Sequence, residues 1–147
     1  MNDLYELPQG WEWEKLSLFL NENPKSKIKV KEADNIGTMP FFTSGQNILR
    51  HSLNLVDDIN IFMSTGGIAS IKIYNGKASY STDTFSYKVK KCNIYYFYYY
   101  ILNNIQFINK ELFKGVGLKH LQKKDFKNQY IPPSTTFRTT THCSKTR

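Results

Sequence analysis

Residues 60–89 alternate apolar and polar side chains over most of their length, and this alternation constrains the fold more than any other feature of the chain. Ile61 and Met63 begin the pattern, and the stretches around Ile71 and Phe85 repeat it. Because successive side chains of a β-strand point to opposite faces, the pattern predicts a meander of about four strands. One face would be apolar. The other would carry lysine, serine and threonine, either to bind a polyanion or simply to meet solvent.

Two glycine-containing pairs mark where these strands should turn. Gly66–Gly67 provides backbone that can bend sharply, because glycine has no Cβ atom to clash. Asn75–Gly76 predicts a two-residue hairpin of type I′, in which both central residues need a positive φ angle. The segment is therefore predicted to fold back on itself at both pairs.

The length and the charge of the chain bound its class. Its 147 residues are enough for one domain with a sizeable core, and we expect a single domain over residues 1–133. Lysine and arginine number 20 against 12 acids, and the formal net charge of +8 indicates a polyanionic partner or serves solubility alone. Residues 134–147 are rich in threonine and lack an apolar period, so we expect a disordered tail there.

Disulfide-rich, zinc-binding and membrane-spanning classes find no support in the sequence. Cys92 and Cys143 are far apart and fit neither a disulfide framework nor a zinc site. The longest apolar run, 94–102, is well short of the roughly 20 residues that a membrane-spanning helix needs, and no basic-then-apolar leader opens the chain. We therefore expect a soluble, cytoplasmic protein.

Lysine occupies every second position of the segment 25–31. In an extended backbone these lysines would share one face, with Ile28 and Val30 on the other. The stripe could follow a phosphate backbone, or it could protect an edge strand against pairing with another chain. Both interpretations are open.

Shorter patterns predict the remaining elements. Trp13, Leu16 and Leu20 indicate a short helix or turn anchored in the core by its tryptophans, with base stacking as the alternative. The other expected elements are a strand over 39–42 entering a Thr-Ser-Gly loop, a tyrosine-rich helix over 94–102 capped by Asn93 and clamped between layers, a short helix over 118–126 with Leu118, Leu121 and Phe126 facing inward, and a closing strand over 128–133. The lysines at 119, 123, 124 and 127 could form a second phosphate-facing cluster or a solvated face.

A series of short motifs runs along the chain in a fixed order. They are Leu7-Pro8-x-Gly10-Trp11-x-Trp13-x-x-Leu16, Phe42-Thr43-Ser44-Gly45, Ser64-Thr65-Gly66-Gly67-x-Ala69, Ser81-Thr82-Asp83-Thr84-Phe85, Phe113-Lys114-Gly115-x-Gly117-Leu118-Lys119-x-Leu121-x-x-x-Asp125-Phe126 and Tyr130-Ile131-Pro132. The ordered set resembles one target recognition domain of the specificity subunit of type I restriction-modification systems, over nearly all of residues 4–133.

The resemblance implies an α+β domain with a twisted, mostly antiparallel sheet and a few short helices, which reads double-stranded DNA without catalysing a reaction. In that family two such domains occur in tandem, separated by long paired helices, and each recognises one half of a split DNA sequence. Methylation subunits dock on the helices and a restriction subunit joins them. S-adenosylmethionine and ATP belong to those partners, so no cofactor is expected here.

The end of the chain departs from the family pattern. Family members continue from the Ile-Pro segment into a long helix, whereas Ile131-Pro132-Pro133 is followed here by the threonine-rich tail. A truncated or frame-shifted product is the simplest explanation. Recruitment of methylation subunits by this chain is therefore an open question.

Polar positions opposite the apolar alternation are the expected DNA contacts. Basic side chains on the stripe and the sheet should position the duplex, namely Lys27, Lys29, Lys72 and Lys88. Loop residues should approach the bases, namely Ser44, Gly45, Arg50, Thr65, Gly66 and Gly67.

Two other functions stay open. Asp125-Phe126-Lys127, with Asp83 or Glu111, could form a metal-dependent nuclease site. The tyrosine-rich helix and the tryptophans could instead form a protein-docking patch. Neither a methyltransferase Asn/Asp-Pro-Pro-Tyr segment nor a nucleotide-binding phosphate loop occurs in the sequence.

Overall fold

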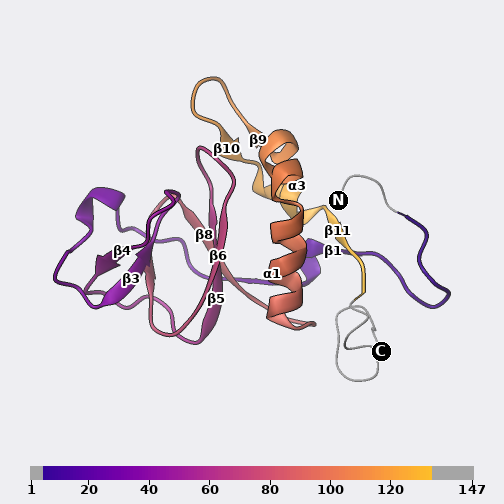
Figure 1. Cartoon of the computed structure of the whole chain (residues 1–147), viewed down its shortest axis with the longest axis horizontal. Helices are drawn as coiled ribbons and strands as arrows, with labels where there is room; N and C mark the ends of the chain where they lie inside the picture. The colour runs from indigo at the N-terminus through magenta and orange to yellow at the C-terminus, as the bar shows by residue number, and fades with distance from the viewer. Residues whose placement is uncertain (1–4, 134–147) are drawn as a thin grey trace.

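The computed structural model describes residues 5–133 (Figure 1). Its strands are β1 (Glu14–Lys15), β2 (Leu20–Glu22), β3 (Met39–Phe42), β4 (Leu49–His51), β5 (Ile59–Ser64), β6 (Ile71–Asn75), β7 (Ser79–Tyr80), β8 (Thr84–Val89), β9 (Phe113–Lys114), β10 (His120–Leu121) and β11 (Tyr130–Ile131). Its helices are the 3₁₀ turns η1 (Leu16–Leu18) and η2 (Val30–Glu32), the α-helices α1 (Ile94–Asn103), α2 (Ile105–Phe107) and α3 (Lys123–Lys127), and the π-helical turn η3 (Ile108–Leu112).

The central sheet is antiparallel and has the strand order β2-β8-β5-β6. Within it, Ile61 of β5 lies opposite Ile73 of β6 on one side and Tyr87 of β8 on the other. A smaller sheet has the order β4-β3-β7, in which β3 and β7 run parallel. The predicted α+β class and the strands of 60–89 are confirmed. Their order differs from a simple meander, because β7 leaves the central sheet and pairs with β3.

Of the two predicted turns, only the first joins paired strands. The chain reverses between β5 and β6, where Gly67 has a φ of +78°. The type I′ hairpin at Asn75–Gly76 is wrong, because Asn75 is the last residue of β6 and pairs with Ile59. The Gly76 N–H donates to the Asp58 carbonyl at 2.9 Å, and the chain then crosses to the smaller sheet.

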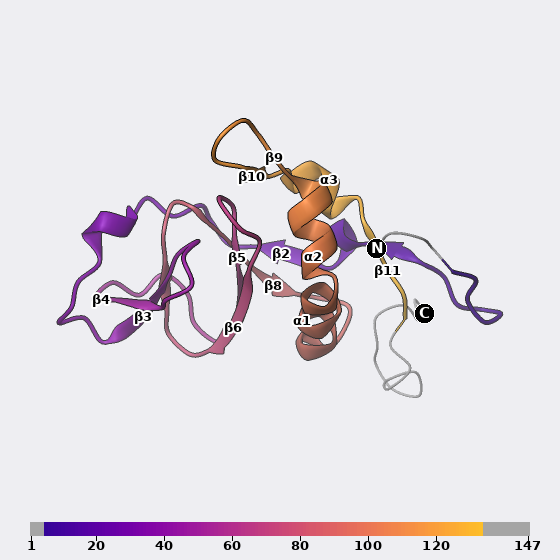
Figure 2. The ribbon, with the colours of Figure 1, turned by 45° about the horizontal axis from the view of Figure 1, so that its top comes forward.

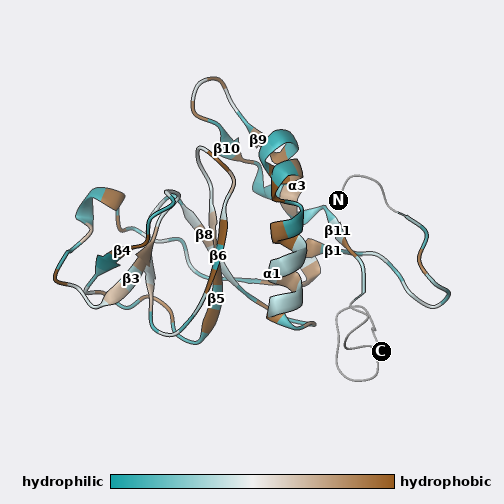
Figure 3. Ribbon diagram, in the orientation of Figure 1, coloured by the Kyte–Doolittle hydropathy of each residue, from teal (hydrophilic) through white to brown (hydrophobic). Residues whose placement is uncertain are grey.

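Strand β5 is buried on both faces, which corrects the prediction of one solvated polar face. Ile61 and Met63 belong to the main core, with exposures of 0% and 1%. Phe62, on the opposite face, is 2% exposed and stacks on Phe42 with ring centroids 4.0 Å apart. The smaller sheet covers the face that the alternation alone assigned to solvent (Figure 3).

The helices cover the other face of the central sheet (Figures 1 and 2). The predicted helix is confirmed as α1, and the Asn93 side chain caps it by accepting from the N–H groups of Tyr95 and Tyr96. Phe97 and Ile101 enter the core. Two tyrosine hydroxyls of α1 donate to main-chain carbonyls near β11. Tyr96 donates to the Pro132 carbonyl and Tyr100 to that of Tyr130 at 3.0 Å.

Two predictions about the first part of the chain need correction. Leu16 and Phe19, both 0% exposed, anchor it in the core, whereas the tryptophans are only half-buried. The lysine segment 25–31 is not a strand, because η2 begins at Val30 and exposes that side chain. The edge-strand interpretation of the stripe is therefore wrong.

The segment after η3 forms a hairpin of β9 and β10, so the helix predicted over 118–126 is only partly correct. Helix α3 begins at Lys123 and buries Phe126, and Leu121 is buried on β10. Leu118 is 63% exposed instead of facing inward. The glycines at 115 and 117 bend the chain here, with φ angles of +143° and +80°, and this bend favours a hairpin over a helix.

The predicted strand over 39–42 is confirmed as β3, and the closing strand as β11, which pairs with β1 through Glu14 and Ile131. The predicted tail and Cys143 lie outside the described residues, so the division into a domain and a tail stays a prediction. Within the described part of the chain no helix is both long and apolar enough to cross a membrane.

Candidate nucleic-acid interface

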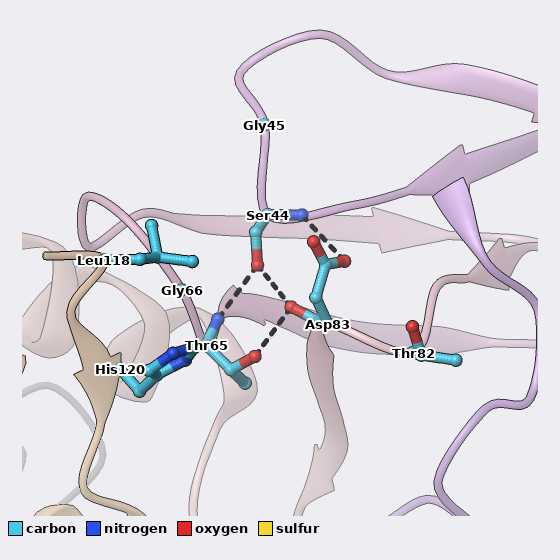
Figure 4. Close-up of a pocket in the computed structure, with 8 residues that line it drawn as sticks. All are labelled: Ser44, Gly45, Thr65, Gly66, Thr82, Asp83, Leu118 and His120. Atoms are coloured by element: carbon cyan, nitrogen blue, oxygen red, sulfur yellow. Dashed lines mark hydrogen bonds between the residues drawn. The ribbon is translucent and has the colours of Figure 1, made fainter. Parts of the chain in front are cut away.

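Four connections converge at one cavity of about 490 Å³ (Figure 4). They are the loop after β3, the β5–β6 turn, the turn before β8, and the β9–β10 hairpin. The residues that line the cavity are Ser44, Gly45, Thr65, Gly66, Thr82, Asp83, Leu118 and His120. Three of these connections start or end at strands of the central or the smaller sheet, and the fourth is the separate β9–β10 hairpin, so these strands set the position of the site.

Ser44, Thr65 and Asp83 join three of these connections, and we call them the latch. The Ser44 hydroxyl donates to the Asp83 carbonyl and accepts from the Thr65 N–H at 3.0 Å. The Thr65 hydroxyl donates to the same carbonyl at 2.9 Å (Figure 4). Both hydroxyl protons are therefore used inside the protein.

Further hydrogen bonds connect the latch to residues around the turn before β8. The Asp83 carboxylate accepts from the Ser44 N–H at 3.3 Å and from the Ser81 hydroxyl. Ser81 also lies 3.0 Å from the Thr84 hydroxyl, which donates to the Phe42 carbonyl at 3.1 Å. Buried groups paired in this way fix the loops, because breaking a pair would leave a polar atom without a partner.

The β9–β10 hairpin is tied to the β5–β6 turn by the main chain. The Leu121 N–H donates to the Thr65 carbonyl at 2.8 Å, and the Gly67 N–H donates to the Lys119 carbonyl at 2.9 Å. A methyl group added at Gly66 would lie 3.7 Å from the His120 ring and 3.8 Å from Leu118. The fourth connection is thus held against the latch.

The two lysines predicted on the sheet support loops. Lys72 Nζ donates to the Gly45 carbonyl at 2.9 Å, and burial lowers the pKa of Lys72. Lys88 Nζ donates to the Asp57 carbonyl at 2.7 Å, outside the cavity. Lys72 holds the loop after β3 in place.

The structure divides the predicted contact residues into separate groups. Five of them line or adjoin the cavity, namely Ser44, Gly45, Thr65, Gly66 and Gly67, and Lys72 lies beside them. Arg50 lines a different cavity with Pro40 and Tyr74. Lys27 lines a third with Ile28 and Leu53, and Lys29, like Lys27, is exposed.

Sequence reasoning missed several residues of the site. Thr82 and His120 are exposed at the cavity, and Leu118 was expected in the core. Asp83 stands within one of the family-like motifs, and that motif was the available signal for Asp83 and Thr82. No pattern marked His120, because a single histidine in a loop has no characteristic spacing.

The site gives no support to a nucleophile or a metal. A serine, a histidine and an aspartate line the cavity, but the Ser44 hydroxyl donates to a main-chain carbonyl, and Figure 4 draws no hydrogen bond to His120. The predicted nuclease residues Asp125 and Glu111 are exposed. In the part of the chain that the structure describes, no three His, Cys, Asp or Glu side chains gather as metal ligands.

Two of the four lysines in the predicted second cluster interact with other residues of the protein. Lys123 Nζ lies 4.7 Å from the centroid of the Phe85 ring, and Lys127 forms an ion pair with Glu22 at 2.8 Å. Burial lowers the pKa of Lys123, with smaller contributions from Glu22, which opposes the shift, and from the neighbouring lysines. Lys119 and Lys124 are exposed.

Three solved structures share the fold. The type I restriction-modification S subunit from M. genitalium matches with a TM-score of 0.71 and 13% identity, over 87% of this chain and 36% of that one. The HsdS subunit from Thermoanaerobacter tengcongensis matches with a TM-score of 0.65 and 16% identity, over 87% and 34%. A third structure, whose description is the structural basis of complex assembly and conformational transition of the type I R-M system, matches with a TM-score of 0.65 and 16% identity. The match covers 90% of this chain and 36% of that one.

The fold is thus that of a domain found in type I S subunits, and the chain spans about a third of the length of these proteins. The family model described as "Type I restriction modification DNA specificity domain" matches residues 8–133. The chain belongs to this family. A comparison with curated proteins gives no match.

Proposed function

We propose that this chain reads the sequence of double-stranded DNA through the four connections around the cavity, and that it catalyses no reaction itself. The observation that carries the proposal is the latch, which holds loops from distant parts of the chain at one place. Base readout needs side chains at fixed positions. Membership of the specificity-domain family supports the same function.

The predicted contacts take different roles in this proposal. Ser44, Thr65 and Lys72 position the loops, because their polar groups are used internally. Gly45, Gly66 and Gly67 keep side-chain bulk away from the bases. Exposed Lys27, Lys29 and Arg50 contact phosphates, and Lys88 holds the loop at Asp57.

We propose that the chemistry of restriction and modification belongs to other subunits, which act on DNA in the cytoplasm. A chain that covers about a third of a typical S subunit provides one recognition domain. Whether methylation subunits bind to it is tested by co-purification with them.

The salt dependence of DNA binding tests the proposal. The affinity for a duplex should fall steeply with salt, and the slope of log affinity against log salt should become shallower by about 0.9 for each phosphate-contacting lysine that is removed. Lys27→Gln with Lys29→Gln should therefore change the slope by roughly 1.8. Lys27 and Lys29 flank Ile28, whose carbonyl accepts from the Thr82 N–H at 2.8 Å, so they adjoin the turn before β8. Lys15→Gln with Lys90→Gln removes the same charge from exposed positions on β1 and after the end of β8, and should change the slope much less.

Different outcomes would favour the other functions. Binding that does not depend on salt, or equal slopes for both pairs of variants, would contradict phosphate contacts at Lys27 and Lys29. Cleavage that requires a metal and is lost in Asp125→Ala would identify a nuclease. The absence of an enriched motif when duplexes are selected from a randomised library would refute sequence reading.

A further inference from the structure

The two adjoining hairpin tips of the site carry large apolar side chains that are exposed to solvent. Ile68 in the β5–β6 turn is 71% exposed, and on the β9–β10 hairpin Val116 is 104% and Leu118 63% exposed. We call these three residues the apolar tip surface. Figures 1 and 2 show the β5–β6 turn next to the β9–β10 hairpin, whose loop projects beyond it.

The exposure of Val116 shows that its apolar side chain does not stabilise the core. Val116 stands between Gly115 and Gly117, both with positive φ angles, in the loop of the hairpin, and its side chain is fully exposed. Such a position buries no apolar area, so a valine there adds nothing to the stability of the core. Contiguous exposed apolar groups on a protein surface more often mark an interaction site.

The β5–β6 turn is tied to the β9–β10 hairpin beside the cavity. The hydrogen bond from the Gly67 N–H to the Lys119 carbonyl, at 2.9 Å, joins the two. Leu118 also lines the cavity, beside the exposed His120. Ile68 lines the adjoining cavity with Ser44 and Gly45, so two of the three side chains lie at the polar groups of the site, and Val116 stands two residues from Leu118.

The charge around the surface identifies the kind of partner. Residues 113–121 contain Lys114 and Lys119, both exposed, and no acidic residue. The partner should thus combine negative charge with small apolar groups. The major groove of DNA does so, because the C5-methyl group of thymine lies between the phosphate chains.

We propose that the apolar tip surface contacts thymine methyl groups in the major groove, and so adds an apolar component to sequence reading. The inference rests on the proposed function. It assigns to Ile68, Val116 and Leu118 a specificity role that is separate from the phosphate contacts.

Replacement of thymine by uracil tests this inference, because uracil keeps the base pairing and lacks only the methyl group. A motif is first selected from a randomised duplex library with the unaltered protein, and each thymine is then replaced in turn. The unaltered protein should lose about fourfold in affinity for each contacted methyl group. The Ile68→Ser, Val116→Ser double variant should bind the thymine duplex more weakly, with an unchanged salt slope, and should lose little further affinity on replacement.

Ile36→Ser provides the matched control, because Ile36 is 89% exposed but lies outside the four connections. It should respond to uracil as the unaltered protein does. A motif without thymine, or equal losses in the double variant and the unaltered protein, would overturn the contact while leaving the proposed function intact. Failure to select any motif would instead refute the proposed function, and the contact with it.

Discussion

At the scale of single residues, Ser44 is where the conformation of the site is decided. Its hydroxyl joins the loop after β3 to the β5–β6 turn and to the turn before β8 through Thr65 and Asp83. A base contact made through this hydroxyl would have to break those internal bonds. Under the proposed function, the residue therefore acts through the loops that it positions and not through a base contact of its own.

Ser44→Ala should lower the free energy of unfolding by about 1–2 kcal/mol, because the partners in Thr65 and Asp83 lose a hydrogen bond in a half-buried position. Denaturation in urea measures this loss. Ser17→Ala changes an exposed serine and should cost less than about 0.5 kcal/mol. Equal stability of the two variants would show that the latch contributes nothing.

At the scale of elements, β5 links the two cores. Ile61 and Met63 pack in the main core that includes the helices, and Phe62 packs against residues of the smaller sheet. The strand is therefore held from both sides. Neither sheet can shift without disturbing the turn that follows β5, and this turn contains Thr65 and Gly67.

Phe62→Ala should lower the free energy of unfolding by about 3–5 kcal/mol, the usual cost of removing a buried phenyl ring. Phe62→Leu keeps more of the side-chain volume and should lower the free energy of unfolding by less. It can be measured if the alanine variant does not fold. Tyr95→Ala, at a tyrosine that is 46% exposed, should cost far less. A cost below about 1 kcal/mol for Phe62→Ala would contradict two-sided packing of β5.

The elements also show how far the sequence could be interpreted. The helix α1 could be predicted because Asn93 is a strong cap and the apolar run is long. Strand β3 could be predicted because a Thr-Ser-Gly loop follows it, and β11 because two prolines end it. The second core could not be predicted, since alternation records only that side chains point in two directions. Which of those directions is covered depends on a sheet formed by strands distant in sequence.

The site was predicted in part for a similar reason. Ser44, Thr65 and the glycines stand in motifs, so they could be named, but their internal hydrogen bonds depend on the approach of Asp83. The lysines were expected on a polar face, whereas Lys72 and Lys88 reach main-chain carbonyls beside them. The exposed side chain of Leu118 depends on the β9–β10 hairpin, because sequence periodicity assigned residues 118–126 to a helix.

At the scale of the whole molecule, the buried tyrosines predict loss of stability at alkaline pH. Burial, with a contribution from Tyr5, raises the pKa of Tyr100 to about 12, and burial also raises the pKa values of Tyr80, Tyr87 and Tyr96 above the ordinary 10. The unfolded chain therefore releases protons before the folded one does. The stabilising contribution is complete below pH 10 and is lost as the pH rises toward 12.

Thermal melting between pH 9 and pH 12 measures this loss. Tyr100→Phe removes one of the groups that titrate only on unfolding, so its melting temperature should fall less steeply above pH 10 than that of the unaltered protein. Tyr95→Phe, at an exposed tyrosine, should leave the slope unchanged. If the melting temperatures of the unaltered protein and Tyr100→Phe fell in parallel above pH 10, the raised pKa of Tyr100 would be contradicted.

The pairing of β1 with β11 places Glu14 directly opposite Ile131, on the far side of α1 from the two sheets (Figure 1). The first and the last strand of the fold therefore lie next to each other. In a longer protein, the residues between β1 and β11 could be exchanged as one unit, and the segments before β1 and after β11 would keep their distance from each other. Under the proposed function, such an exchange would change the DNA sequence that is read and leave the neighbouring segments as they are.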